Sequence, residues 1–135
     1  MTKEELQAQS VSLIKQNSRV ALQWCTGLGK SKAAIDMANY LNNEKLKKYK
    51  KPLNILLVVA EIPHKSNWGK EFNKWKIGTD NIVVECYASL RKYRDTSWDL
   101  IIFDEAHHLS SDLRMDILPH LQAEYVILLS ATLPD

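Results

Sequence analysis

Short apolar runs alternate with stretches of helical spacing, and this alternation restricts the possible folds more than any other feature of the sequence. The strand-like runs are residues 19–25, 54–60, 81–86, 99–104 and 125–130. Apolar residues recur three and four positions apart in residues 6–17, 31–42, 66–76 and 113–121, which indicates amphipathic helices. Strands separated by helices predict βαβ units and a parallel sheet. The unbroken run 54–60 is typical of a strand buried on both faces.

The size and composition of the chain fit one folded domain. The chain has 135 residues, of which 45% are hydrophobic, so it can bury a substantial core and is not a disordered segment. Its first ten residues contain no apolar leader, and no apolar run approaches the ~20 residues that cross a bilayer. Cys25 and Cys86 each lie in an apolar run and are expected to be reduced, buried thiols. We therefore expect a soluble protein that is cytoplasmic, in a bacterial or phage-infected cell, or nucleoid-associated.

Charge is divided unevenly along the chain, although the net charge is only +2. Residues 42–76 hold nine basic and three acidic side chains, whereas residues 99–135 hold one basic and seven acidic ones. The basic part predicts contact with a polyanion, and the acidic part offers carboxylates for a metal. Within the basic part, residues 45–51 are expected to form a solvated surface loop between a helix and a strand.

A candidate phosphate-binding loop joins the first strand to the second helix. Its sequence is Trp24-Cys25-Thr26-Gly27-Leu28-Gly29-Lys30-Ser31. Glycines let successive backbone N–H groups face one anion, and the N-terminus of the following helix favours phosphate. Lys30 would reach the β- and γ-phosphates, and the Ser31 hydroxyl would bind Mg²⁺. Trp24 stands where the usual pattern has its first glycine, so an ordinary glycine turn before a helix is the alternative.

A pair of carboxylates follows the fourth predicted strand. Asp104 and Glu105 come directly after four apolar residues, where a phosphate-loop enzyme needs a metal-binding carboxylate. Asp104 would hold Mg²⁺, and Glu105 would polarise the attacking water. The alternative is that these two carboxylates only begin a helix. Similarly, Ser130 and Thr132 could simply terminate the fifth strand.

Three motifs in order resemble motifs I, II and III of superfamily 2 helicases and translocases: GLGKS at 27–31, DEAHH at 104–108 and SAT at 130–132. Residues 57–75 resemble motif Ia of Swi/Snf-type translocases, and phage and restriction-system translocases share these features. The resemblance implies that ATP and Mg²⁺ bind here, with Asp104, Glu105 and Lys30 as catalytic residues and Ser31 and Asp104 as metal ligands. The implied nucleotide contacts are Gln7, Thr26, Gly27, Leu28, Gly29, Lys30 and Ser31.

The same resemblance implies further roles outside the nucleotide contacts. It assigns His107, Ser130 and Thr132 to coupling between the nucleotide state and the second lobe, and Lys65 to contact with the nucleic-acid backbone, DNA in preference to RNA. Contacts to the backbone would be electrostatic and independent of sequence. His108 is expected to be a surface or packing residue. Trp68, Phe72 and Trp75 share one helix face and could stack on bases, but packing in the core is the favoured interpretation.

These observations together predict an α/β RecA-like phosphate-loop NTPase domain with a central, mainly parallel sheet. Residues 1–135 would form the N-terminal ATP-binding lobe of a helicase or translocase, and the second RecA-like lobe would be absent from them. Such a lobe is expected to bind ATP weakly and to hydrolyse little of it alone. A single-lobe, non-catalytic module that binds nucleotide or nucleic acid is the alternative. A small-molecule kinase is a third possibility, but no segment suggests its acceptor pocket or lid.

Overall fold

The computed structural model describes residues 11–23, 30–50, 53–60, 68–70 and 81–130, and the structural statements below concern these residues. The strands are β1 (Arg19–Gln23), β2 (Ile55–Val59), β3 (Ile82–Cys86), β4 (Thr96–Phe103) and β5 (Leu121–Ser130). The helices are α2 (Lys30–Tyr49) and α4 (Ser111–Asp116), with 3₁₀ turns η1 (Tyr87–Tyr93), η2 (Ala106–His108) and η3 (Leu118–His120). Residues 11–16 are also helical. No helix in this part of the chain is both long enough and apolar enough to span a bilayer.

The five strands form one sheet in the order β1-β5-β4-β2-β3, and every neighbouring pair is parallel. The predicted α/β class with a parallel sheet is therefore confirmed. β5 is the last strand in sequence but lies between β1 and β4. This arrangement brings the end of the first strand close to the ends of the fourth and fifth strands.

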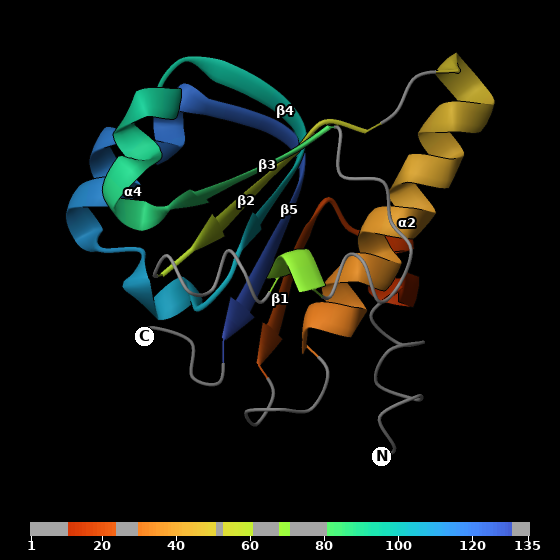
Figure 1. Cartoon of the computed structure of the whole chain (residues 1–135), viewed down its shortest axis with the longest axis horizontal. Helices are drawn as coiled ribbons and strands as arrows, with labels where there is room; N and C mark the ends of the chain where they lie inside the picture. The colour runs from red at the N-terminus through yellow and green to blue at the C-terminus, as the bar shows by residue number, and fades with distance from the viewer. Residues whose placement is uncertain (1–10, 24–29, 51–52, 61–67, 71–80, 131–135) are drawn as a thin grey trace.

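Helices and turns cover both faces of the sheet (Figure 1). Alternate residues of each strand point to opposite faces, and the core is accordingly divided into two clusters. One cluster packs the sheet against α2 and residues 11–16, and includes Leu57, Leu100 and Ile102. The other packs it against η1, η2 and the segment around Ile117, and includes Leu56 and Phe103. All five residues of β2 are buried, as the unbroken apolar run predicts for a strand covered on both faces.

Three elements are longer than the sequence pattern predicts, including β4, which begins at Thr96 instead of 99. The expected surface loop at 45–51 is wrong for residues 45–49, because α2 continues to Tyr49. Lys47 and Lys48 lie in its last turn, where cations interact favourably with the helix dipole. β5 begins at Leu121 instead of 125, because residues 121–123 pair with the first residues of β4. The helix expected at 113–121 is shorter, since α4 ends at Asp116 and Leu118–His120 form a 3₁₀ turn.

Candidate nucleotide and metal site

The carboxyl ends of β1, β5 and β4 meet at one edge of the sheet. Gln23, the last residue of β1, is in register with Ser130 of β5, and Phe103 of β4 is in register with Leu128. Asp104 therefore follows β4 at the same edge as the ends of β1 and β5. In open parallel sheets, ligands bind outside the carboxyl ends of the strands where neighbouring connections diverge. The sheet thus brings the chain positions of the three predicted motifs to one edge.

Helix α2 begins at Lys30, immediately after the candidate phosphate loop. The first turns of an α-helix carry backbone N–H groups without partners inside the helix, and these groups attract anions. Ala33 and Ala34 are fully buried, so small side chains let the first turns of α2 approach the sheet closely. The helix start at Lys30 therefore matches the strand–loop–helix order that phosphate binding requires.

The Asp104 carboxylate is held by hydrogen bonds from two directions. The indole Nε1–H of Trp68 donates to Oδ2 at 2.9 Å, and the backbone N–H of Glu105 donates to Oδ1 at 3.0 Å. The backbone of Asp104 is also fixed, because its N–H donates to the Val58 carbonyl and its carbonyl accepts the Tyr87 hydroxyl at 2.7 Å. The carboxylate lies at the boundary of core and solvent, in a defined orientation.

Glu105 adopts a left-handed backbone conformation, with φ 50° and ψ 59°. Glutamate rarely occupies this region, and residues held there cost on the order of 1 kcal/mol or more. Such strain tends to occur at functional sites, where it directs a side chain that ordinary geometry would place elsewhere. The turn changes the direction of the chain between the end of β4 and η2. The Glu105 side chain is half-buried there.

The Tyr87 hydroxyl donates to the Asp104 backbone and lies close enough to both carboxylates to be influenced by their charge. Burial raises the pKa of Tyr87 well above its ordinary value, and the negative charges of Asp104 and Glu105 raise it further. Tyr87 therefore remains a neutral hydrogen-bond donor throughout the physiological pH range. Its ring also packs against Phe103 and the ring of the exposed His108, at centroid distances of 6.3 and 6.1 Å.

The described side chains suit magnesium better than a metal with an all-protein ligand set. In the part of the chain that the structure describes, no three His, Cys, Asp or Glu side chains gather as a metal cluster. Mg²⁺ needs only one or two carboxylates, because phosphate oxygens and water complete its octahedron. Asp104 would hold the ion, and the bound nucleotide would supply the phosphate oxygens. A resident Mg²⁺ would stabilise negative charge on these phosphates.

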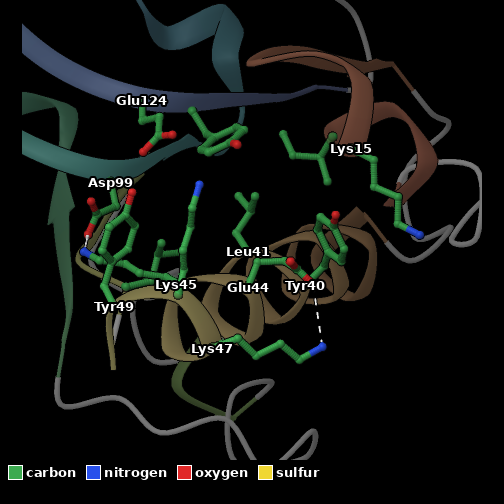
Figure 2. Close-up of a pocket in the computed structure, with 13 residues that line it drawn as sticks. Lys15, Tyr40, Leu41, Glu44, Lys45, Lys47, Tyr49, Asp99 and Glu124 are labelled. Atoms are coloured by element: carbon green, nitrogen blue, oxygen red, sulfur yellow. Dashed lines mark hydrogen bonds and ion pairs between the residues drawn. The ribbon is translucent and has the colours of Figure 1, made fainter. Parts of the chain in front are cut away.

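A second concave region lies at the opposite, amino-terminal end of the strands (Figure 2). It is a cavity of about 680 Å³ between residues 11–16, the second half of α2 and the β4–β5 pair. The Lys45 ammonium forms an ion pair with Asp99, whose Oδ2 also accepts the backbone N–H of Asn54 at 2.9 Å. Its described lining residues lie at the amino ends of the strands, whereas Asp104 and Glu105 follow the carboxyl end of β4.

Comparisons with known proteins agree on the fold. Residues 76–135 match the family described as type III restriction enzyme, res subunit. The SWI2/SNF2 ATPase core of Sulfolobus solfataricus in complex with dsDNA superposes with a TM-score of 0.72 and 20% identity, over 97% of this chain and 31% of that chain. The ATPase core domain from the same organism gives a TM-score of 0.68 and 19% identity, over 95% of this chain and 30% of that one.

A restriction enzyme has the same fold. A nuclease-deletion mutant of the Type ISP restriction-modification enzyme LlaGI, in complex with a DNA substrate mimic, superposes with a TM-score of 0.67 and 16% identity. The match covers 96% of this chain and 17% of that one. The predicted RecA-like α/β fold is confirmed, and the partial family match agrees with the resemblance to superfamily 2 helicases. This RecA-like lobe spans from 17% to 31% of the length of these solved structures. No curated protein sequence matches it significantly.

The predicted site residues of this RecA-like lobe fall into three groups. Asp104 and Glu105 are described in full and are adjacent at the carboxyl edge of the sheet. Lys30 and Ser31 begin α2, His107 lies in η2 and Ser130 ends β5, each placed by its backbone. The remaining predicted residues lie outside the described part of the chain: Gln7, Thr26, Gly27, Leu28, Gly29, Lys65 and Thr132.

Two contacts of the site were not predicted from the sequence. Trp68 is buried, as core packing predicts, but its indole also donates to Asp104. The Tyr87 hydroxyl donates to the backbone of the same residue. The sequence does contain a signal for both contacts. Trp68 comes after β2 and Tyr87 directly follows β3, and these two strands lie on the same side of β4 in the sheet. An aromatic residue with a polar atom that follows such a strand can reach the carboxyl end of a neighbouring strand.

Proposed function

We propose that this chain is the ATP-binding lobe of an ATP-dependent DNA helicase or translocase, in which ATP hydrolysis drives movement on nucleic acid. Mg²⁺·ATP would bind at residues 26–31, with Asp104 on the metal and Glu105 as the base that activates water. His107, Ser130 and Thr132 would pass the nucleotide state to a second lobe. The protein would act in the cytoplasm or on the nucleoid.

One observation carries this proposal more than any other. The end of β1, the start of α2 and the Asp104–Glu105 pair lie at one edge of the sheet, although more than 70 residues separate Lys30 from Asp104 in the sequence. A phosphate loop and a metal carboxylate must be close to act on the same nucleotide. Every strand of a parallel sheet ends at this edge, but β5 alone separates β1 from β4, so the two segments are near enough to act on one nucleotide.

Nucleotide binding is tested by calorimetry with Mg²⁺ and a non-hydrolysable ATP analogue on the wild-type chain and on Lys30→Ala. The substitution is expected to abolish binding, because Lys30 would contact the β- and γ-phosphates. The matched control is Lys47→Ala, which removes an exposed lysine of the same helix at its other end. Circular dichroism should show both variants folded. Equal affinity for the analogue in wild type and Lys30→Ala would refute the assignment.

DNA binding is tested by the salt dependence of affinity for a short duplex. Lys65→Ala is expected to weaken binding and to reduce the slope of log affinity against log salt by about one. Lys47→Ala again serves as control, since its loss should leave the slope unchanged. A slope in Lys65→Ala equal to that of wild type would remove Lys65 from the proposed contact. Comparing duplex RNA with duplex DNA in the same titration decides between the two polymers.

A further inference from the structure

Trp68 connects two segments that the proposed mechanism treats separately. It lies in a helical segment, residues 68–70, and is only 3% exposed. Its ring belongs to the core cluster between the sheet and α2, while its Nε1–H reaches Asp104 Oδ2 at 2.9 Å. The residue thus has one side in the core and its single polar atom at the proposed metal site.

The chemistry of this contact is directional. An indole N–H can only donate, and a carboxylate can only accept while it is ionised. A hydrogen bond to an ionised acceptor is stronger than a neutral one, and it fixes the acceptor's orientation. With Trp68 on Oδ2 and the Glu105 N–H on Oδ1, rotation of the Asp104 carboxylate would break one of two hydrogen bonds.

We propose that Trp68 is a positioning residue, which holds the Asp104 carboxylate in the orientation that binds Mg²⁺. This inference rests on the proposed function. Outer-shell donors that orient a metal ligand commonly change metal affinity by about 10- to 100-fold when removed.

Trp98 provides a matched control within the same chain. It is half-buried on β4, and its Nε1–H donates to the Thr96 hydroxyl at 2.8 Å. Trp68→Phe and Trp98→Phe therefore remove the same group, an indole hydrogen bond of nearly equal length, while each keeps an aromatic ring. Only the Trp68 hydrogen bond has a carboxylate as its acceptor.

The decisive experiment titrates Mg²⁺ against nucleotide binding in the full chain. Trp68→Phe is expected to raise the Mg²⁺ concentration for half-maximal binding about tenfold. Affinity for nucleotide without metal should not change. Trp98→Phe should behave as wild type in both measurements.

The outcomes separate the two proposals. If the wild-type chain binds no Mg²⁺·ATP, the proposed function fails and the role of Trp68 fails with it. If wild type binds Mg²⁺·ATP and Trp68→Phe has the same Mg²⁺ requirement as Trp98→Phe, only the role of Trp68 is overturned. A purely structural role would lower thermal stability and would leave the metal requirement of the folded fraction unchanged.

A measurement on the unsubstituted protein keeps the inference testable even if Trp68→Phe does not fold. In a ¹⁵N-labelled chain with bound nucleotide, Mn²⁺ should broaden the Trp68 indole resonance more strongly than that of Trp98. Asp104→Asn should shift the Trp68 resonance and leave that of Trp98 in place. Equal broadening of the two indoles would contradict the proximity of Trp68 to the metal.

Discussion

β4 carries one aspartate in its amino-terminal half and is followed by another at its carboxyl end, and different groups hold the two. Asp99, in the amino-terminal half, is bound by the Lys45 ammonium and the Asn54 N–H. Asp104, just past the carboxyl end, accepts hydrogen bonds from the Trp68 indole and the Glu105 N–H. A salt bridge thus holds the first carboxylate, and an indole and a backbone amide orient the second.

Backbone strain also differs between the residues before β4 and the residues after it. Asp95 immediately precedes β4 and Glu105 closely follows it, and both have positive φ, at 65° and 50°. Aspartate tolerates this conformation because its short side chain can satisfy nearby backbone groups, whereas glutamate has no such advantage. The unfavourable residue type stands at the proposed catalytic end.

The largest expected difference between the two ends is in metal-dependent nucleotide binding. Asp104→Asn should weaken Mg²⁺-dependent binding of ATP by more than about tenfold, since loss of a metal ligand exceeds the loss of an outer-shell donor. Asp99→Asn, the same chemical change five residues earlier, should leave this binding unchanged. Calorimetry at fixed Mg²⁺ checks both. Equal affinities in the two variants would show that the ends of β4 are not functionally distinct.

Strain gives the next largest effect, measured as the free energy of unfolding in urea. Glu105→Gly should be more stable than Glu105→Ala by about 1–2 kcal/mol, because glycine adopts positive φ without a steric penalty. Asp95→Gly should gain less stability over wild type than Glu105→Gly does, because aspartate tolerates positive φ better than glutamate. All variants are compared at pH 7. A smaller gain over wild type at 105 than at 95 would mean that the turn after β4 is relaxed.

The sequence predicts the parallel sheet and the chain positions of the site, because both depend on local pattern. Residues 54–60 read as a buried strand without any tertiary information, and the apolar run before Asp104 places a carboxylate at a strand end. The extra length of β5 was missed although its sequence carries a signal, because apolar and polar residues alternate in 121–125, as in a half-buried strand. The Trp68–Asp104 bond, in contrast, depends on tertiary structure, because 36 residues separate its partners.

A smaller effect on the free energy of unfolding is expected at alkaline pH, and at the site it comes from Tyr87. The pKa of Tyr87 is raised by burial and by the two carboxylates. Its phenol therefore keeps its proton in the folded state when the unfolded state loses it above the ordinary pKa of about 10. Stability should thus fall with rising pH from about 10, and this residue contributes up to about 1.4 kcal/mol per pH unit.

Tyr87→Phe tests this alkaline effect. The variant loses the hydrogen bond to the Asp104 carbonyl, which costs about 1 kcal/mol at neutral pH. Its stability should then decline less steeply above pH 10 than that of wild type. Urea denaturation at pH 8, 10 and 11 measures both quantities. Parallel declines in the two proteins would place the alkaline sensitivity at other groups.

The smallest expected effect concerns the ion pair at the amino end. The Lys45 and Asp99 side chains keep 21% and 23% of their exposed surface, so solvent and salt partly screen their attraction. Lys45→Met preserves the aliphatic stem that covers the floor of the cavity and removes only the charge. We expect a loss of about 0.5–1 kcal/mol of unfolding free energy, smaller at 1 M salt than at 0.1 M. A double-mutant cycle with Asp99→Asn isolates the pair, and a coupling energy near zero would show that Asn54 alone satisfies Asp99.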